Sequence, residues 1–234
     1  MIYEASRALV IGSTAKAFSD ATDVVNAERS SGLFVELWVQ QWLLGHLTLT
    51  RVLDDFYITG HWVVTPLFFV WLYRTRRSLY PYVRNAFLVA NGIALAIFIV
   101  FPVAPPRLLT ASGFVDTLGG ISKVHLHGGA LSGWFNPYAA MPSMHFGYAF
   151  MIGVVMAVLV RSWAVRLLVL AYPVLVFVTI IGTGNHYIAD CAVGCVVMGA
   201  GFIVLEGWRL CRPPVRSLGR TVLDRLSTRL RVPG

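Results

Sequence analysis

Charged side chains are scarce in this sequence. They make up 13% of its 234 residues, whereas 57% of the residues are hydrophobic, and a soluble domain usually carries about 25% charged residues. Uncharged stretches occupy 85–106, 124–160 and 167–189, and each exceeds the roughly 20 residues that a helix needs to cross a bilayer. The composition therefore argues against a soluble fold and predicts one compact membrane domain with several spans.

Cysteine is also rare, and no secretion signal is evident. The three cysteines are Cys191, Cys195 and Cys211. Their odd number, and the one-turn spacing of the first two within an apolar run, indicate small core residues and not a disulfide framework. The first residues lack a basic start followed by an uninterrupted apolar segment, so we expect no cleaved signal peptide.

Lysine is rare too, so the basic excess consists almost entirely of arginine. The sequence has 19 basic and 11 acidic residues, a net charge of +8, and only Lys16 and Lys123 are lysines. A basic excess can indicate nucleic-acid binding. The arginines, however, stand in short blocks between apolar stretches, which is typical of charges that set membrane topology. We therefore predict no nucleic-acid partner.

The hydropathy pattern predicts an all-α integral membrane protein with a six-helix transmembrane bundle. Five clear spans are expected at about 55–73, 84–102, 142–160, 165–182 and 187–208. Residues 33–50 are apolar but interrupted by polar side chains, and we predict a weak first crossing there, with an interfacial helix as the alternative. The expected organisation is a lead-in over 1–54, a membrane core over 55–208 and a basic tail over 209–234.

The distribution of arginine predicts the orientation. Thirteen arginines fall in 74–84, in 161–166 and in the tail, and the positive-inside rule puts them on the cytoplasmic side of the cell membrane. The long Pro- and Gly-rich loop 103–141 is then extracytoplasmic. In the tail, apolar residues recur every four positions from Leu218 to Leu230, which favours a helix on the anionic inner leaflet; a solvated, disordered tail is the alternative.

Three polar clusters interrupt the apolar chain, and the predicted topology puts all of them at the outer face. Ionisable groups in membrane segments cost several kcal/mol, so they indicate function by default. Arg107 follows two prolines where a span ends. Ser143 and His145 begin a span after a proline, where the free N–H groups of a helix start favour an anion. His186 and Asp190 begin the last span.

The spacing of His186 and Asp190 puts them on one helical face within contact. A carboxylate bonded to one imidazole nitrogen raises the basicity of the other, as in the Asp-His half of a catalytic triad. Each cluster also has a plainer interpretation, with Arg107 as a headgroup anchor and His186 as a core histidine with a satisfied partner. Convergence of the clusters at one membrane face favours the functional interpretation.

Together the clusters predict a phosphoryl-transfer site that needs no cofactor. An arginine neutralises the phosphate oxygens, one histidine attacks phosphorus, and the other protonates the leaving alkoxide. The alternative is a zinc site formed by His145, His186, Asp190 and one of His125 or His127. No compact metal-binding motif is present and the nearby arginine would repel a cation, so we predict no metal.

Two of these clusters resemble signatures of the type 2 phosphatidic acid phosphatase superfamily. The second signature of that family reads Pro-Ser-Gly-His and the third ends in His-x-x-x-Asp. The corresponding segments here are Pro142-Ser143-Met144-His145 and His186-x-x-x-Asp190. Segments 101–107, 139–143 and 184–187 are similar to the inositol phosphorylceramide synthase branch and its bacterial relatives. The resemblance covers about 55–208.

The resemblance implies a histidine nucleophile, an orienting aspartate and a second histidine as the acid for the leaving group. Two cations of the family pattern are replaced by Val100 and Ile180, so Arg107 carries more of the charge neutralisation. The expected catalytic residues are His186, Asp190 and His145, and the expected phosphate-binding residues are Arg107, Ser143 and Lys123.

The predicted function is cleavage of a phosphoester or pyrophosphate of a membrane lipid, such as a phospholipid or a prenyl phosphate. The acceptor depends on what the loop and the neighbouring spans admit. For a bacterial-looking chain of this size we place hydrolysis before transfer to an inositol-like polyol or a lipid alcohol. The residues expected to face the acceptor are Asn136, Tyr138, Asn185 and Tyr187. The alternative for the aromatic residues of the loop is that they form an aromatic belt at the membrane interface. For the whole protein, the lower-ranked alternative is a small transporter or channel.

Overall fold

The computed structural model of this chain describes residues 14–122 and 137–211. Within these ranges the chain is helical, and no β-strand occurs there. The α-helices are α2 (Thr14–Ser30), α3 (Glu36–Leu44), α4 (Leu47–Thr75), α5 (Tyr80–Val100), α6 (Met144–Leu159), α7 (Trp163–Gly182) and α8 (Ile188–Cys211). Three short turns, η1 (Pro106–Leu108), η2 (Thr110–Ser112) and η3 (Thr117–Ile121), follow α5. The predicted all-α class is confirmed.

Within the described residues, four helices are long and apolar enough to cross a membrane, namely α4, α5, α7 and α8. The shorter α6 has 16 residues and covers about 24 Å at 1.5 Å per residue. Large apolar side chains on all five are more than half exposed, among them Leu67, Ile99, Val158, Leu168 and Ile203. Such a surface is suited to lipid tails, so the described chain is a multi-pass membrane bundle.

The first span does not form as predicted. Residues 33–50 divide at Gly45 into α3 and the start of α4. The nine residues of α3 cover only about 14 Å, which is too short to cross a bilayer. Of the polar residues that interrupt this segment, Glu36 and Gln40 are fully buried, whereas Gln41 and His46 are exposed. Glu36 and Gln40 face other parts of the protein, which is why the hydropathy of the segment did not indicate its position.

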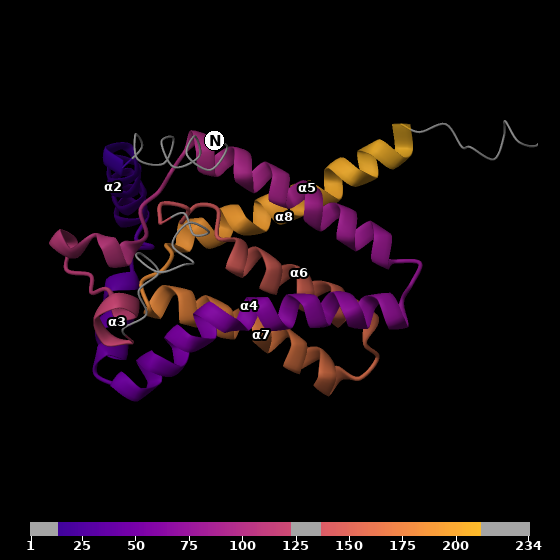
Figure 1. Cartoon of the computed structure of the whole chain (residues 1–234), viewed down its shortest axis with the longest axis horizontal. Coiled ribbons are helices and arrows are strands. Elements are labelled where there is room, and N and C mark those ends of the chain that lie inside the picture. The colour runs from indigo at the N-terminus through magenta and orange to yellow at the C-terminus, as the bar shows by residue number, and fades with distance from the viewer. Residues whose placement is uncertain (1–13, 123–136, 212–234) are drawn as a thin grey trace, which may run out of the picture.

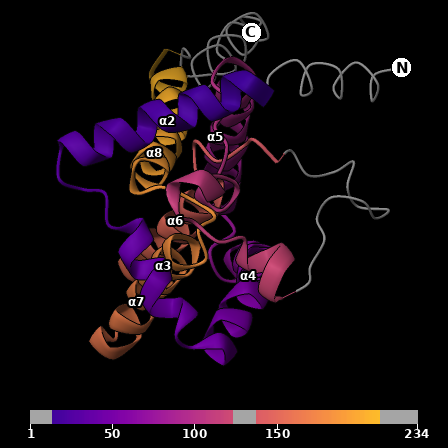
Figure 2. The ribbon, with the colours of Figure 1, turned by 90° about the vertical axis from the view of Figure 1, so that its left-hand side faces the viewer.

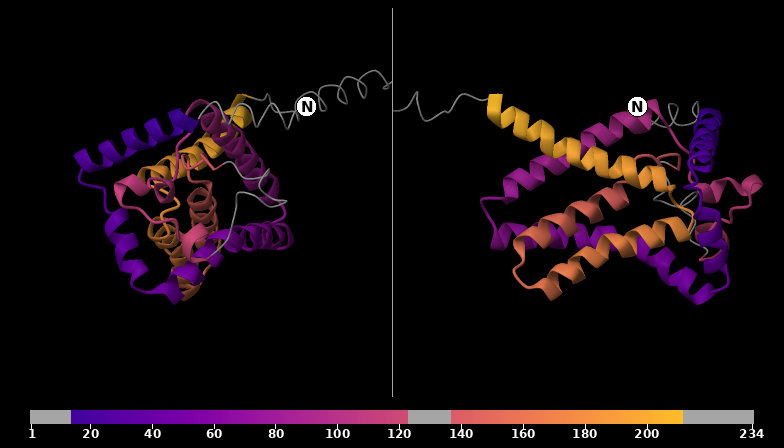
Figure 3. Two further views of the ribbon diagram at one scale, coloured as in Figure 1. Left: turned by 60° about the vertical axis from the view of Figure 1, so that its left-hand side comes forward. Right: turned by 180° about the vertical axis from the view of Figure 1, so that it is seen from behind.

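The two ends of the bundle carry different segments. The α4–α5 and α6–α7 connections lie at one end, together with the last turns of α8, whereas α2, α3 and the η1–η3 segment lie at the other (Figures 1 and 3). The arginines at 74–84 and 161 therefore share one end. The sequence clusters around residues 107, 143 and 186 share the opposite end, as the pattern predicted.

The first described helix, α2, lies across the end of the bundle (Figure 2). Its buried residues Ala17, Ala21 and Val24 join one apolar cluster with Val103 and Ala104 from the segment that follows α5. Ala104 also donates its backbone N–H to the carbonyl of Ala17 at 3.0 Å. The lead-in is thus an integral part of the polar end of the molecule.

Small residues let the helices around α8 approach closely. A methyl group at Gly194 would collide with the backbone carbonyl of Ser143, and one at Gly201 would collide with the carbonyl of Ala86. Such small-residue contacts allow tight helix packing where no hydrophobic effect drives association in lipid. They hold α8 against the start of α6 on one side and against α5 on the other.

Candidate active site

His186 stands in the turn before α8, and its imidazole is bonded on one side. Nδ1 lies 3.2 Å from Oδ2 of Asp190 and 2.8 Å from the carbonyl oxygen of Ala140. A carbonyl oxygen only accepts hydrogen bonds, so Nδ1 carries the proton and Nε2 of the neutral ring keeps its lone pair. The predicted contact between His186 and Asp190 is present.

The second nitrogen of His186 is available for chemistry. Nε2 is buried and has no hydrogen-bond partner in the described part of the chain, and the whole residue is only 3% exposed. A buried polar atom without a partner is uncommon in folded proteins and requires an explanation. A lone pair aimed at a bound substrate supplies one, because a nucleophile must be free until the substrate arrives.

His145 lies in the first turn of α6 and faces His186, with 5.7 Å between the ring centroids. Its ring is stacked on Tyr57 of α4 at 4.4 Å. His61, one turn further along α4, packs edge-to-face against the His145 ring, with 4.3 Å between the two ring centroids. His145 at the start of α6 and His186 in the turn before α8 thus lie in the same small region.

Ser143 connects the two helices that carry the histidines. Its Oγ caps α6 by accepting from the N–H of Phe146, at 3.4 Å, and its own N–H donates to the carbonyl of Asp190, at 2.9 Å. The residue is fully buried. These bonds fix the starts of α6 and α8 relative to one another, which is a positioning role beside the predicted one in phosphate binding.

Arg107 reaches the same region from η1. Its side chain bonds the amide oxygen of Asn185, and its Nε lies 3.8 Å from Oδ1 of Asp116. The guanidinium also contacts the Tyr57 hydroxyl, and the residue is 6% exposed. The three clusters singled out in the sequence therefore converge.

The glycine turn before His186 has a conformation that other residues rarely adopt. Gly184 has a φ of +66°, its carbonyl accepts from the N–H of Arg107 at 2.8 Å, and a Cβ there would collide with the side chain of Gln40. The Gln40 amide in turn bonds the backbone of Val115 in both directions, at 2.9 and 3.0 Å. The turn is thus packed from α3 as well as from the loop.

Two predicted acceptor residues, Asn185 and Tyr187, have side chains that are engaged within the protein, and two further predicted residues are not described by the structure. Asn185 is buried and holds Arg107 and Thr183. Tyr187 is fully buried, and its hydroxyl donates to the carbonyl of Ala104 at 3.1 Å; burial raises its pKa, so it stays protonated. Both side chains hold the loops, and a role toward an acceptor stays a prediction. Lys123 and Asn136 lie outside the described residues.

Tyr138 is half-buried next to the site. Its ring contacts Phe18 of α2 edge-on at 6.2 Å, and its carbonyl accepts from the N–H of Val103 at 2.9 Å. His125, His127 and the tail from residue 212 onward also fall outside the described ranges. Within those ranges, no three His, Cys, Asp or Glu side chains are grouped to hold a metal ion.

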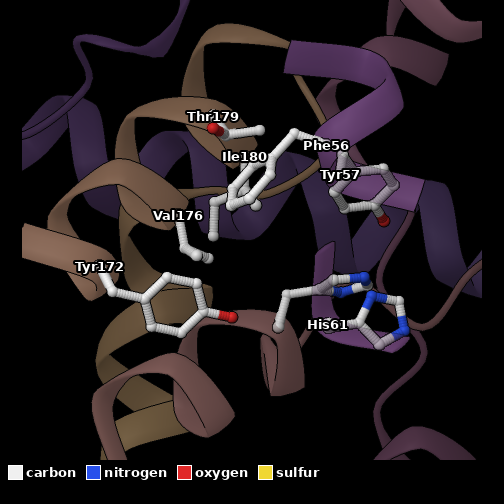
Figure 4. A pocket seen from close by; sticks show the side chains of 8 residues that line it. Phe56, Tyr57, His61, Tyr172, Val176, Thr179 and Ile180 are labelled. Atoms are coloured by element: carbon white, nitrogen blue, oxygen red, sulfur yellow. The ribbon is translucent and has the colours of Figure 1, made fainter. Parts of the chain in front are cut away.

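Sequence reasoning missed the contribution of α4. A pocket beside His145 has walls from α4 and α7, with Tyr57 and His61 facing Tyr172 across it (Figure 4). Its lining consists of Phe56, Tyr57, His61, His145, Tyr172, Val176, Thr179 and Ile180. The spacing of Tyr57 and His61, four residues apart in an apolar helix, is the signal that was available.

Asp54 is a second missed residue of α4. It is fully buried and accepts hydrogen bonds from Thr117 at 2.8 Å and from Ser122 at 2.6 Å. Thr117 also contacts the carbonyl of Thr183 at 3.0 Å. Asp54 thereby ties the segment after Arg107 to the turn before His186.

Comparison with known proteins gives one match. A family model described as the PAP2 superfamily matches residues 22–204. No curated protein and no solved structure matches the chain. The matched range includes every described residue of the polar end from the middle of α2 onward.

Proposed function

The chain belongs to the PAP2 superfamily, whose family model covers more than three quarters of it, and from this premise we propose a metal-independent lipid phosphatase or phosphotransferase. Members of the superfamily are phosphatases and phosphotransferases acting on phosphoesters, so the chain is an enzyme of this general kind. The finer proposal concerns the lipid substrate, the covalent intermediate and the side of the membrane.

The observation that carries the proposal is the free Nε2 of His186. In the first step its lone pair attacks phosphorus, a P–N bond forms and the P–O bond to the leaving group breaks. Nδ1–H keeps its contact with Asp190, which stabilises the charge that develops on the ring. Arg107 neutralises the equatorial oxygens of the transferring group. Ser143, and Lys123 outside the described residues, remain proposed phosphate ligands.

His145 supplies and takes back one proton. It donates a proton to the departing alkoxide in the first step, and in the second it takes the proton of the attacking hydroxyl. The oxygen of water or of an alcohol then forms a P–O bond, the P–N bond breaks, and His186 is regenerated. With water the product is phosphate, and with an alcohol it is a new phosphoester.

A lipid substrate is supported by the position of the site. The histidines lie at the end of an apolar bundle, and the adjacent pocket is lined by apolar and aromatic side chains of α4 and α7. A headgroup phosphate bound between Arg107 and His186 would leave its apolar part next to the membrane-spanning helices. Phospholipids and prenyl phosphates both have this form.

The acceptor separates the two forms of the proposal. The likeness of 101–107, 139–143 and 184–187 to the inositol phosphorylceramide synthase branch favours an alcohol, and the replacement of two cations by Val100 and Ile180 fits the same branch. Against this, the side chains of Asn185 and Tyr187 are engaged within the protein. We therefore keep hydrolysis as the first proposal and transfer as the second.

The test uses the purified protein in detergent with labelled phosphatidic acid or a prenyl diphosphate. We expect release of labelled phosphate and trapping of a phosphohistidine that is stable to base and labile to acid, both absent in His186→Ala. Addition of inositol, glycerol and diacylglycerol in turn measures how the label divides between phosphate and an alcohol product. Capture by an alcohol at low concentration would reverse our ranking, and uptake into liposomes without release or transfer would overturn the enzyme proposal.

We also propose that the site is extracytoplasmic and the C-terminus cytoplasmic, because of the arginines at the opposite end. A cysteine at Ala111, which is exposed in η2, should react with a membrane-impermeant thiol reagent added to intact cells. A cysteine at Ser78, exposed in the α4–α5 connection, should not. Both are made with Cys195 and Cys211 replaced by serine, because Cys195 is partly exposed whereas Cys191 is buried. The opposite labelling would place the chemistry in the cytoplasm.

A further inference from the structure

Two glutamates from outside α8 bond the backbone of its first turn. Oε1 of Glu28, at the end of α2, accepts from the N–H of Ala189 at 2.8 Å. Oε1 of Glu36, at the start of α3, accepts from the N–H of Ile188 at 2.9 Å. The next N–H upstream, that of Tyr187, donates to Asp190 at 2.9 Å. Three consecutive N–H groups are thus each bonded by a carboxyl group from a different helix.

The two glutamates lie side by side. Both are buried, at 3% and 0% exposure, and their Oε1 atoms accept from consecutive N–H groups of one helix turn. The Oε2 atom of each has no hydrogen-bond partner in the described part of the chain. Two buried like charges repel, and an ionised carboxylate has no hydrogen to donate, so one proton placed between the pair removes the repulsion and supplies the missing donor.

We propose, on the basis of the function proposed above, that Glu28 and Glu36 are positioning residues that share a single proton and hold the first turn of α8, and with it His186 and Asp190, in the reactive arrangement. His186 is two residues before the N–H that Glu36 accepts, and Asp190 directly follows the one that Glu28 accepts. Movement of this turn changes the direction of the His186 lone pair.

Loss of the shared proton leaves two buried carboxylates facing each other beside Asp190. The titratable groups that act on the pair are Asp190, Tyr187 and Cys191, and none of these is a cation. The guanidinium of the neighbouring Arg29 lies over the Phe34 ring, 4.8 Å from its centroid. The N–H groups of Ile188 and Ala189 compensate the negative charge in part, and the repulsion that remains favours movement of α2 or α3 away from α8.

The direction of the pH effect follows from the burial. Desolvation first, and then the neighbouring carboxyl group of Glu36, raise the pKa of Glu28 to about 8. A group with a raised pKa binds its proton more tightly in the folded state. Its contribution to stability is full below the usual glutamate value near 4.5 and is lost as the pH rises to about 8.

The variant that tests the proposal is Glu28→Gln. The glutamine oxygen can still accept from Ala189 and its NH₂ can donate to Glu36, so the variant imitates the protonated pair without titrating. We expect the ratio of its kcat to that of the wild type to rise about tenfold between pH 7 and pH 9, since only about a tenth of a group with a pKa near 8 remains protonated at pH 9. Both proteins contain His145, so any effect of His145 on kcat at alkaline pH cancels in the ratio.

Two further variants make the outcome decisive. Glu36→Gln should behave like Glu28→Gln, whereas the double variant places two NH₂ groups against each other and should be less active than either single variant. Asp23→Asn, an exposed carboxylate on the same helix, should leave the ratio at one. A constant ratio for Glu28→Gln, or a double variant as active as the singles, would overturn the proposal.

A readout without substrate separates this proposal from the proposed reaction. In detergent, the apparent Tm of Glu28→Gln minus that of the wild type should increase as the pH rises from 5 to 8. Above pH 8 this difference should stay constant. If neither protein acts on any lipid phosphate but this increase appears, the shared proton stands and the reaction fails. If the Tm difference is the same at every pH, the shared proton is wrong whatever the enzyme does.

Discussion

The two ends of the bundle differ in the burial of their charged side chains. At the end with the histidines, Asp23 and Asp55 are exposed, but several charged side chains are buried, among them Glu28, Asp54, Arg107 and Asp190. At the other end the arginines of 74–84 and 161–166 are exposed. Buried charge has to be compensated by hydrogen bonds and partners, whereas exposed charge at a membrane surface has little energetic cost.

This difference separates the residues proposed to do chemistry from the arginines proposed to set the orientation in the membrane. At the polar end nearly every buried charge has a specific partner from another element, so a substitution there disturbs several loops. At the far end the arginines are exposed; Arg166 bonds the carbonyls of Ala157 and Val160 at the end of α6, whereas Arg161 is a surface position where substitution should have little local effect. Substitutions at the two ends should therefore differ sharply in effect.

The largest effect is expected for His186→Ala. Removal of the nucleophile should lower turnover by more than about 10⁴-fold and abolish phosphoenzyme trapping, because no other group at the site has its position and free lone pair. Steady-state phosphate release and acid-quench labelling measure this. His46→Ala, an exposed histidine between α3 and α4, is the control and should keep full activity. Residual labelling in His186→Ala would move the nucleophile to another residue.

His145→Ala should have the next largest effect, about 10²- to 10⁴-fold on turnover of alkyl phosphates. The loss reflects the missing proton for the leaving alkoxide, so an acidic leaving group such as p-nitrophenol should recover most of the rate of the covalent step. Burst kinetics on the two substrates give the comparison. An equal loss on both would show that His145 acts in some other way.

Arg107→Ala should lower kcat/KM by about 10²-fold, since the side chain neutralises phosphate oxygens in a buried site. The exposed Arg161→Ala at the opposite end should change it less than about twofold, within the usual effect of surface substitutions. The pair is the direct test of the contrast between the two ends. Similar losses in both variants would remove the contrast.

Asp54→Asn should act more weakly, through position. The asparagine NH₂ cannot accept the bond that the carboxylate takes from Thr117 or Ser122, and the loss of a buried bond of this kind costs about 1–3 kcal/mol. We expect a lower apparent Tm and a loss in kcat smaller than that of Arg107→Ala. Asp55→Asn, the exposed neighbour, is the matched control. An unchanged Tm would show that Asp54 does not hold the loop.

Asp190→Asn should have the smallest effect on the stability of the fold. Its effect on turnover should be intermediate. An asparagine oxygen can still accept from Tyr187, so α8 keeps its start, while the charge that supports the His186 imidazolium is lost. Turnover should fall less than in His186→Ala and the apparent Tm should shift by a few degrees at most. A collapse in Tm would make Asp190 mainly a structural residue.

The long apolar helices and the His186–Asp190 contact could be predicted from the sequence because they depend on local spacing. Residues 142–160 were predicted as a span, and α6 occupies Met144–Leu159. The prediction of a membrane crossing over 33–50 was wrong because of contacts with distant parts of the chain. Glu36 and Gln40 bond the start of α8 and the backbone of Val115, and no pattern within the segment indicates these distant partners.

The same reasoning explains which site residues were missed. Glu28 belongs to a lead-in whose role was not evident, and its partner Ala189 is 161 positions away. Tyr57 and His61 are ordinary members of an apolar helix until α6 brings His145 beside them. Asn185 and Tyr187 were recognised by motif, but a motif does not show whether a side chain faces a cavity or the interior.

The contact of Gly194 with Ser143 has a consequence for how this enzyme could be altered. Because backbone meets backbone there, the starts of α6 and α8 form one rigid unit, and the two histidines cannot be moved apart without disrupting it. The α4 wall of the pocket is formed by side chains, with Phe56, Tyr57 and His61 facing α7. If this pocket takes part of the substrate, as proposed, its shape can be varied most freely at Phe56 on α4, whereas His61 packs against the His145 ring and is less free to change.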